Sequence, residues 1–279
     1  MAYRRILTVQ DISCLGQCSG TVALPILSAC GQEACILPTA VLSTHTGGFG
    51  AVTKRDLTED FSGILAHWKR EKLDFDAVYT GYLGGKEQIA WVRNIFDSMV
   101  APGGVRIVDP AMADHGKLYK SFDDAFVEEM RSLCAEADVI IPNVTEGGML
   151  AEIPYQEEPD REFVKTLLEK LGKICPRVVL TGVGEKPGKT GAAVYWEGEV
   201  WQYSHPKGEK SYHGTGDMFA AAFVGAWQQG KTPREAVKIA ADFTALAIGK
   251  TKENPAHWYG VKFETALPEL VQMVFGRDM

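Results

Sequence analysis

The sequence predicts an α/β fold built on a mainly parallel β-sheet. Short apolar segments recur along the chain, and each is continuously apolar rather than alternating. Continuous apolar runs are typical of strands buried on both faces of a sheet. Amphipathic stretches of helical period separate these segments, and such alternation favours parallel pairing. We interpret residues 1–279 as one domain, because no long linker or internal repeat divides the chain.

The expected strands and helices follow in order. The strands are Tyr3–Val9, Ala34–Leu37, Ala77–Thr80, Val105–Val108, Val139–Ile141 and Val178–Leu180. Helical patterns lie between them at Asp56–Arg70, Glu87–Met99 and Arg161–Lys173. A hairpin is expected from Gly191–Trp196 and Val200–His205, with a glycine-centred turn between the two strands. Beyond Gly214 the pattern is helical, over 215–229, 233–249 and about 263–274.

Composition excludes several classes of protein. Apolar residues make up 46 % and charged residues 23 % of the chain, which is ordinary globular usage. The net charge of −7 argues against binding to nucleic acid or to an anionic membrane. The longest apolar run, Met218–Trp227, is half the length of a membrane span. No secretion signal is evident, so we expect a cytosolic protein whose six cysteines stay reduced.

Polar, small and acidic residues follow each of the six expected parallel strands. Since the carboxyl ends of parallel strands meet at one edge of a sheet, these residues predict a ligand site there. The segments are Gln10–Ser13, Ser43–Gly48, Gly81–Gly85, Asp109–Pro110, Pro142–Glu146 and Thr181–Gly182.

The segment Gly214-Thr215-Gly216-Asp217 precedes an apolar helix and carries the sharpest chemical signal. Glycines at a helix N-terminus leave backbone N–H groups bare, and the helix dipole adds roughly half a positive charge there. Such a turn can hold a phosphate. Asp217 lies beside these amides and could accept a proton from an attacking hydroxyl. The alternative is that Asp217 only complements the helix dipole, which would not explain both glycines.

Two pairs of polar residues and a glycine-rich segment leave their roles open. Asn143 and Glu146 could hold the waters of a Mg²⁺ ion or could form a capping box. Asp109 and Asp114 could bridge a cation to a phosphate, although an Asp-Pro turn is the alternative for Asp109. The glycines after His45 and Thr46 predict a flap around 40–55, which is either a lid or a plain hairpin turn.

Taken in order, these motifs resemble the ribokinase-like superfamily, and within it the pyridoxal (vitamin B6) kinases. The matching pieces span nearly the whole chain. They are Gln10-Asp11, Ser43-Thr44-His45-Thr46, Gly81-Tyr82-Leu83-Gly84, Asp109–Asp114, Pro142–Glu146 and Gly214–Asp217. The His-Thr and Gly-Tyr-Leu-Gly pieces are the ones more specific to vitamin B6 kinases.

The resemblance implies a three-layer α/β/α fold with a central, mostly parallel sheet and a small flap. It also implies that ATP is the phosphoryl donor, that Mg²⁺ is required, and that pyridoxal, pyridoxine or pyridoxamine is the substrate. The resemblance further implies a homodimer. Whether a monovalent cation is required stays open. Asp217 would deprotonate the 5′-hydroxymethyl group, and the Gly214, Thr215 and Gly216 amides would stabilise charge on the γ-phosphate. Asp11, His45, Thr46 and Tyr82 would bind the vitamer. ATP would meet Asp109, Asn143, Glu146 and Thr181, and the metal would meet Asp109, Asp114 and Glu146.

Two departures from the family pattern stand out. Asp11 occupies a position where many members carry serine, and Ala113 replaces a glycine between Asp109 and Asp114. Two other functions remain open. One is a hydroxymethylpyrimidine kinase of the same skeleton, and the other is a non-catalytic protein that binds a B6 vitamer through the same glycine turn.

Overall fold

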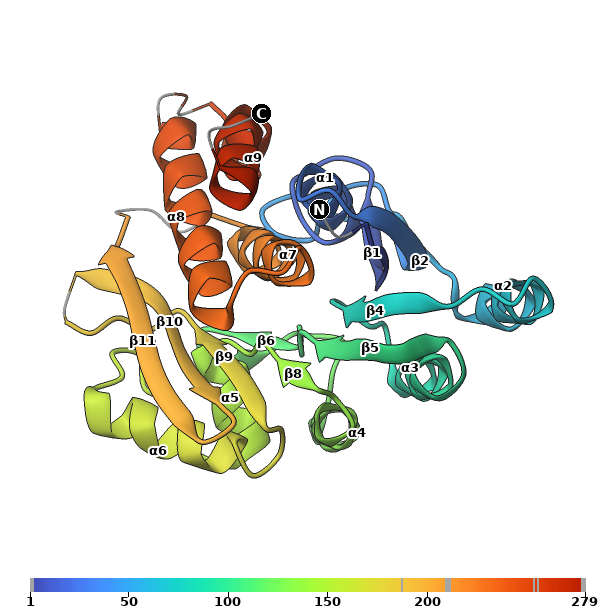
Figure 1. Cartoon of the computed structure of the whole chain (residues 1–279), viewed down its shortest axis with the longest axis horizontal. Coiled ribbons are helices and arrows are strands. Elements are labelled where there is room, and N and C mark those ends of the chain that lie inside the picture. The colour runs from blue at the N-terminus through green and yellow to red at the C-terminus, as the bar shows by residue number, and fades with distance from the viewer. Residues whose placement is uncertain (1–2, 187, 209–211, 253, 255, 277–279) are drawn as a thin grey trace.

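The computed structural model describes residues 3–186, 188–208, 212–252, 254 and 256–276. Within these residues nine strands form one sheet in the order β11-β10-β9-β8-β5-β4-β1-β2-β3. Helices cover both faces of this sheet (Figure 1), which confirms the expected three-layer α/β/α arrangement. A second, two-stranded sheet pairs β6 (Ala113–Asp114) with β7 (Lys117–Leu118).

All six strands expected in the sheet are present and run parallel to one another. They are β1 (Arg5–Ser13), β2 (Glu33–Leu42), β4 (Phe75–Thr80), β5 (Val100–Val108), β8 (Val139–Ile140) and β9 (Arg177–Thr181). At both edges of the sheet the strands pair antiparallel to their neighbours. At one edge, β3 (Lys54–Asp56) pairs with β2. At the other, the expected hairpin of β10 (Lys189–Trp196) and β11 (Glu199–Pro206) extends β9.

Each face of the sheet has its own helical layer (Figure 1). One layer comprises α1 (Gly20–Ala29), α7 (Thr215–Gln228), α8 (Pro233–Lys252) and α9 (Leu267–Phe275), which a 3₁₀ turn at Phe263–Ala266 precedes. The other comprises α2 (Thr58–Arg70), α3 (Lys86–Ser98), α4 (Asp124–Ala135), α5 (Val144–Ala151) and α6 (Arg161–Leu171). The sheet thus separates two hydrophobic cores.

Three of these helices were not expected from the sequence. α1 is apolar almost throughout and contains Pro25, so it lacks a polar face and a helix-like pattern. α4 has 12 residues and α5 has 8, and both begin at polar N-caps, Asp123 and Asn143, whose side chains accept backbone N–H bonds. The sequence analysis weighed Asn143 as part of a capping box, but it predicted neither helix.

Two strands extend further than expected. β1 continues to Ser13 and β2 to Leu42, so Asp11 lies within a strand rather than after it. The register of this pair shifts between Gln10 and Ile12. Pro38, opposite Gln10, has no N–H to donate, which accounts for an irregular ladder at this point. Such irregularities re-aim neighbouring side chains, and Asp11 lies at this one.

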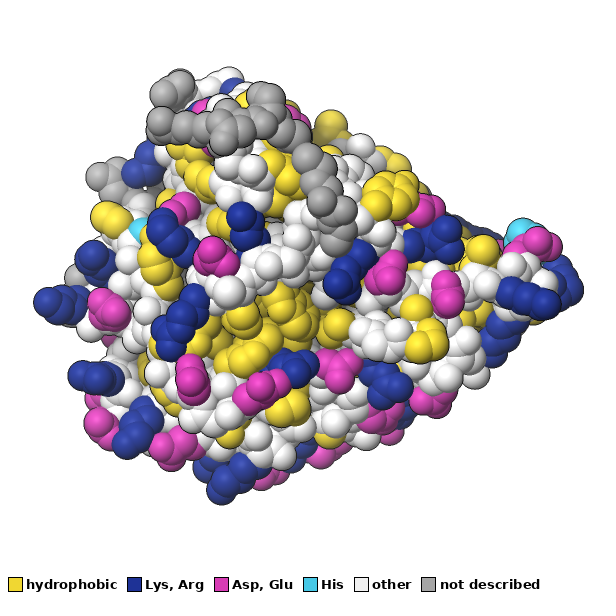
Figure 2. All heavy atoms as spheres, in the orientation of Figure 1, with side chains coloured by type: hydrophobic (Ala, Val, Ile, Leu, Met, Phe, Trp, Pro, Cys, Tyr) yellow, Lys and Arg dark blue, Asp and Glu magenta, His cyan; other side chains and the backbone are white. Residues whose placement is uncertain are grey.

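The segment expected to form a flap is an antiparallel hairpin. β2 and β3 pair from Ala40–Asp56 to Leu42–Lys54, and residues 43–53 connect them. Gly47 and Gly48 of this connection lie so close to the rings of His213 and Trp258 that a Cβ on either would clash. Among the described residues, no helix combines the length and hydropathy that a membrane crossing needs. Figure 2 shows both signs of charge interspersed on one face, around a central group of hydrophobic side chains.

Candidate active site

The carboxyl ends of the parallel strands and the N-terminus of α7 meet at one edge of the sheet. The carboxylate of Asp217, in the first turn of α7, interacts electrostatically with Asp11 on β1 and with Asp109 at the end of β5. Asp109 in turn interacts with Glu146 on α5. Four carboxylates from four elements therefore share this edge, as the sequence predicted.

The two glycines before Asp217 differ in their surroundings. Gly214 is the N-cap of α7 with φ 77°, and a Cβ there would lie 1.8 Å from the carbonyl oxygen of Gln17. Gly214 is therefore required by the close approach of the loop before α1. Gly216 has nothing within 4 Å of its Cβ position, so open space lies in front of this turn. The first-turn N–H groups of α7 have no intrahelical partners and can meet an anion in that space.

The Asp217 carboxylate does not cap its own helix. It accepts a hydrogen bond from the backbone N–H of Ser19, with 2.9 Å between Oδ2 and N. Burial raises the pKa of Asp217 to about 6, while the Ser19 bond lowers it and Asp11 raises it further. A carboxylate with a pKa near 6 is mostly ionised at neutral pH and is a better base than an ordinary one. The dipole-partner alternative explains neither this remote bond nor the pKa.

Asp11 is buried, with 5 % of its surface exposed. Burial raises the pKa of its carboxyl group, whereas hydrogen bonds from the Ser19 and Ser13 hydroxyls and the charge of Lys54 lower it. Lys54 lies over the ring of Tyr82, 5.8 Å from its centre. Lys54 is thus a cation between two predicted vitamer-binding residues, and the sequence analysis missed it because a lone lysine carries no pattern.

The remaining residues predicted to bind the vitamer have different surroundings. His45 is buried; its Nδ1 accepts from the N–H of Gly47 and its Nε2 donates to the carbonyl of Tyr259 at 2.9 Å. Burial lowers the pKa of this imidazole, so it is neutral and holds the flap to the segment around Tyr259. Thr46 is exposed on the flap. The Tyr82 hydroxyl lies 3.3 Å from Ser121 Oγ, facing solvent.

Asn143 and Glu146 form the capping box that the sequence left as one of two alternatives. Asn143 Oδ1 accepts from the N–H of Glu146, and Glu146 Oε2 accepts from the N–H of Asn143 at 2.8 Å. Glu146 Oε1 also accepts from the N–H of Met112. Burial raises the pKa of Glu146, while the hydrogen bonds from the backbone N–H groups of Asn143 and Met112 lower it. The carboxylate of Glu146 is therefore occupied by backbone groups on both oxygens.

Asp109 and Asp114, bracketing the same loop, differ in their environment. Asp109 is buried, and its carboxylate accepts no hydrogen bond from the described residues. Burial, with the nearby charges of Glu146 and Asp217, raises its pKa well above the ordinary range. Asp114 is exposed and faces His115 of its own hairpin. The backbone N–H of Thr181, at the end of β9, donates a hydrogen bond to the carbonyl of Pro142, the residue before Asn143.

A divalent cation fits this region through phosphate or water rather than as a protein-caged ion. No three Asp, Glu, His or Cys side chains of the described residues lie close enough together to ligate one metal ion. Burial and the nearby charges of Glu146 and Asp217 raise the pKa of Asp109, and a cation would relieve the repulsion among these carboxylates. Mg²⁺ usually keeps several waters and takes one or two carboxylates together with substrate phosphates.

Comparison with known proteins decides the family. The model of the phosphomethylpyrimidine kinase family matches residues 24–261, most of the chain. The chain belongs to the phosphomethylpyrimidine kinase family. A Bacteroides thetaiotaomicron protein described provisionally as such a kinase, and crystallised with pyridoxal, is 36 % identical, with 96 % of each chain covered and a TM-score of 0.90.

Two further relatives are pyridoxal kinases. The Lactobacillus plantarum enzyme is 30 % identical over 98 % of each chain, with a TM-score of 0.90. Pyridoxal kinase PdxY of Actinobacillus pleuropneumoniae is 27 % identical, with 91 % of this chain and 90 % of that protein covered. The resemblance to vitamin B6 kinases with a ribokinase-like fold is confirmed.

In this member of the phosphomethylpyrimidine kinase family, three functional candidates escaped the sequence analysis. The Ser19 backbone hydrogen-bonds Asp217, and Lys54 interacts electrostatically with Asp11. Tyr79 on β4 is fully buried, and its hydroxyl, within electrostatic reach of Asp109 and Asp217, has no hydrogen-bond partner among the described residues. A tyrosine at the end of an apolar strand looks like core, and only the tertiary structure places its hydroxyl beside the acids.

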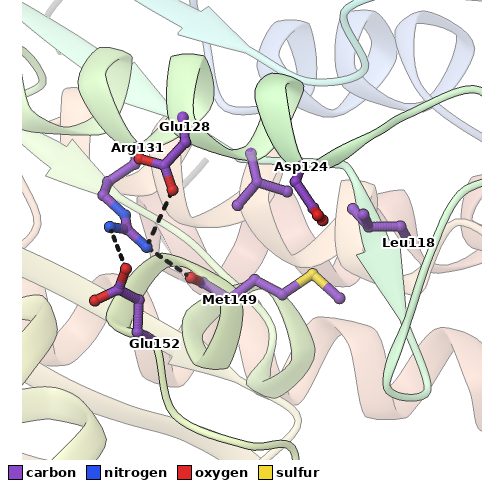
Figure 3. Close-up of a pocket in the computed structure, with 7 residues that line it drawn as sticks. Leu118, Asp124, Glu128, Arg131, Met149 and Glu152 are labelled. Carbon is purple, nitrogen blue, oxygen red and sulfur yellow. Dashed lines mark hydrogen bonds and ion pairs between the residues drawn. The ribbon is translucent and has the colours of Figure 1, made fainter.

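A pocket on the α4–α5 side lies outside this group of acids (Figure 3). Leu118, Val127 and Met149 supply its apolar wall. Arg131 lies along one side, where it pairs with Glu152 and Glu128 and donates to the carbonyl of Met149. Arg131 therefore ties α4 to the end of α5, while the three acids of the lining, Asp124 included, leave the pocket acidic.

Proposed function

We propose that this protein is a vitamin B6 kinase that transfers the γ-phosphate of ATP to the 5′-hydroxymethyl group of pyridoxal, pyridoxine or pyridoxamine. The observation that carries the proposal is the position of Asp217. Its carboxylate, with a pKa of about 6, lies one residue after Gly216, where open space fronts the bare N–H groups of α7. A base and an anion site within one helical turn suit transfer of a phosphoryl group to a hydroxyl.

The proposed reaction assigns a task to each part of the site. Asp217 removes the proton of the 5′-hydroxyl as its oxygen bonds to the γ-phosphorus. The bond from that phosphorus to the bridging oxygen breaks, and ADP leaves. The amides of Gly214, Thr215 and Gly216 stabilise the charge on the transferring group. Such transfer depends mainly on positioning and charge stabilisation.

The nucleotide end of the site would lie toward β5, β8 and β9. Bound Mg²⁺ would neutralise phosphate charge there. Asp109 is the residue placed to hold it, while Glu146 and Asn143 keep the backbone of Met112 and Ala113 in place by hydrogen bonds. Asp114 would reach the metal only through water, and Thr181 would touch a phosphate. Asp11, His45, Thr46 and Tyr82 would face the vitamer.

A second candidate substrate is hydroxymethylpyrimidine, which the name of the matched family favours. The proteins of pyridoxal-kinase name among the relatives, and the neighbour crystallised with pyridoxal, favour the vitamer. A homodimer and a cytosolic location, both expected from the sequence, remain part of this proposal. Sedimentation of the purified protein tests the dimer.

One assay separates the candidate functions. ADP release, coupled to NADH oxidation, is measured with pyridoxal, pyridoxamine, pyridoxine and hydroxymethylpyrimidine in turn. We expect turnover with the vitamers and a lower kcat/KM for the pyrimidine. A preference for the pyrimidine would reassign the substrate. Binding of pyridoxal without ADP release from any compound would leave only the non-catalytic binding function.

A further inference from the structure

Ser19 has an unusual backbone for the first residue of a helix. It is the N-cap of α1 with φ 50° and ψ −131°, and its side chain makes no capping bond. The polar N-caps Asp123, Asn143 and Asp160 all have extended backbones and cap their helices with their side chains. A residue with a Cβ is strained at positive φ, so Ser19 carries strain and gives up its cap.

The backbone of Ser19 faces two ways. Its carbonyl accepts from the N–H groups of Val22 and Ala23 and so begins α1. Its N–H points away from α1 and donates to Asp217 Oδ2 at 2.9 Å, across 198 residues of sequence. The positive φ of Ser19 accompanies this orientation of its amide toward α7.

The side chain of Ser19 lies beside Asp11, the acid proposed to face the vitamer. Ser19 is buried, with 7 % of its surface exposed. Its side chain lies within hydrogen-bonding reach of the Asp11 carboxylate and lowers the pKa of that group. Ser19 therefore lies beside both acids, and its backbone N–H bonds Asp217 at 2.9 Å.

The loop that presents Ser19 is held on several sides. Thr21 Oγ1 donates to the carbonyls of Gly16 and Cys18, at 3.1 and 2.8 Å. The Gly16 Cα lies against the ring of His45, and the Gln17 carbonyl lies against Gly214. Because the surrounding contacts fix the loop, they can maintain a strained conformation at Ser19.

We propose that Ser19 is a positioning residue, whose strained backbone N–H orients the Asp217 carboxylate while its hydroxyl holds Asp11. The inference rests on the proposed function, since it assigns Asp217 the role of base. The structural alternative is that Ser19 merely starts α1. The positioning role and the structural role predict different results for variants that favour or disfavour positive φ at residue 19. Only the positioning role predicts a change in the pKa of Asp217.

The variants separate the backbone of Ser19 from its hydroxyl. Ser19→Gly favours positive φ and keeps the N–H, whereas Ser19→Val disfavours positive φ. Ser19→Ala keeps the N–H and removes only the hydroxyl. Lys72→Val is the matched control, because Lys72 also has a positive φ, 55°, at an exposed turn after α2.

Two readouts report on Asp217. The first is its pKa, followed by ¹³C NMR of labelled aspartate side chains in the intact protein without substrate. The second is kcat, with KM for ATP measured alongside. Among the described residues, the titratable groups shown to interact electrostatically with Asp217 are acids, phenols and a thiol: Asp11, Cys18, Tyr79, Asp109 and Tyr119. Loss of the Ser19 bond therefore removes a group that lowers the pKa and leaves those that raise it.

We expect Ser19→Val to raise the pKa of Asp217 by about one unit and to lower kcat at least about tenfold, with little change in KM for ATP. Ser19→Gly keeps kcat within about threefold and raises Tm, because it relieves strain. Ser19→Ala keeps the pKa of Asp217 and raises that of Asp11. Lys72→Val lowers Tm and leaves kcat unchanged.

Three results would overturn the inference. The first is a folded Ser19→Val whose kcat and Asp217 pKa are unaltered. The second is a Ser19→Gly whose kcat falls as far as that of Ser19→Val. The third is a Ser19→Ala in which the pKa of Asp217 shifts and the pKa of Asp11 does not. If Ser19→Val does not fold, the results for Ser19→Gly and Ser19→Ala still test the inference. An Asp217 pKa that shifts as expected in an enzyme inactive on every vitamer would sink the proposed function and leave the positioning role standing.

Discussion

Asn143 and Glu146 cap the start of α5 reciprocally, and Glu146 uses both carboxylate oxygens to do so and to hold the next loop. Oε2 accepts from Asn143 N–H at 2.8 Å, and Oε1 accepts from Met112 N–H at 3.2 Å. The position therefore requires two acceptors, which a carboxylate provides and a carboxamide does not.

Glu146→Gln should consequently destabilise the fold by about 1–3 kcal/mol, because its NH₂ group must face a backbone N–H. Urea unfolding measures the change. Glu235→Gln is the matched control: in the Thr232–Glu235 capping box, one oxygen, Oε2, accepts both bonds, so an amide oxygen can replace it. Equal losses in the two variants would contradict the two-acceptor argument. A raised Mg²⁺ requirement with unchanged stability would instead make Glu146 a metal-shell residue.

Asp217→Asn tests the proposed base. We expect turnover to fall by about 10²–10⁴-fold with the affinity for ATP preserved, because an amide cannot take the proton. Steady-state kinetics with pyridoxal and nucleotide binding by calorimetry measure the two effects. Turnover within threefold of the wild type would reduce Asp217 to a partner of the helix dipole.

The raised pKa of Asp217 has a consequence for stability. The folded carboxyl titrates at about 6, above its ordinary 3.8, so between these values the folded state binds more protons than the unfolded state. Its contribution to stability is therefore largest below pH 4 and is lost as pH rises through 6. Asp217→Asn should thus gain about 1–3 kcal/mol over the wild type between pH 4 and pH 7. Unfolding free energies of both proteins across this range measure the gain; a constant difference would contradict the raised pKa.

The acid limb of the rate profile should follow the same group. Since the ionised form of Asp217 is the base, kcat/KM should decline as pH falls below about 6. The measurement is kcat/KM for pyridoxal between pH 5 and pH 8. An acid limb near pH 4 would show that the working carboxylate has an ordinary pKa.

Gly214 and Gly216 should respond differently to the same substitution. Gly214→Ala places a methyl group 1.8 Å from the Gln17 carbonyl at a positive φ, so we expect a large loss of stability. Gly216→Ala has free space and should fold as well as the wild type, yet its methyl group enters the space proposed for the phosphate. We expect its Tm to be preserved and its kcat/KM for ATP to fall at least about tenfold. Unchanged kinetics in Gly216→Ala would remove the phosphate from this turn.

Asp11 should favour a cationic vitamer. An ionised carboxylate only accepts hydrogen bonds, and pyridoxamine brings a 4′-ammonium where pyridoxal brings an aldehyde. A bond to a charged group is worth about 1.5–3 kcal/mol, so the preference could reach roughly 10–100-fold. Asp11→Ser should lower the ratio of kcat/KM for pyridoxamine over pyridoxal. A ratio that does not move would place Asp11 against a ring group that all vitamers share.

The sequence by itself determined the α/β class, the six parallel strands and the edge at which the acids gather. These features follow from local patterns: continuous apolar runs, helical period, and polar residues after each strand. It also left the choice at Asn143 and Glu146 open, because a capping box and a metal shell use the same residue types.

Only the tertiary structure decided which groups touch. It separated Gly214, which close approach of the Gln17 carbonyl requires, from Gly216, which faces open space. It also joined Ser19 to Asp217 across 198 residues. The physical reason is that a local pattern records the preferences of neighbours in sequence, whereas hydrogen-bond partners and pKa values depend on groups brought together by packing.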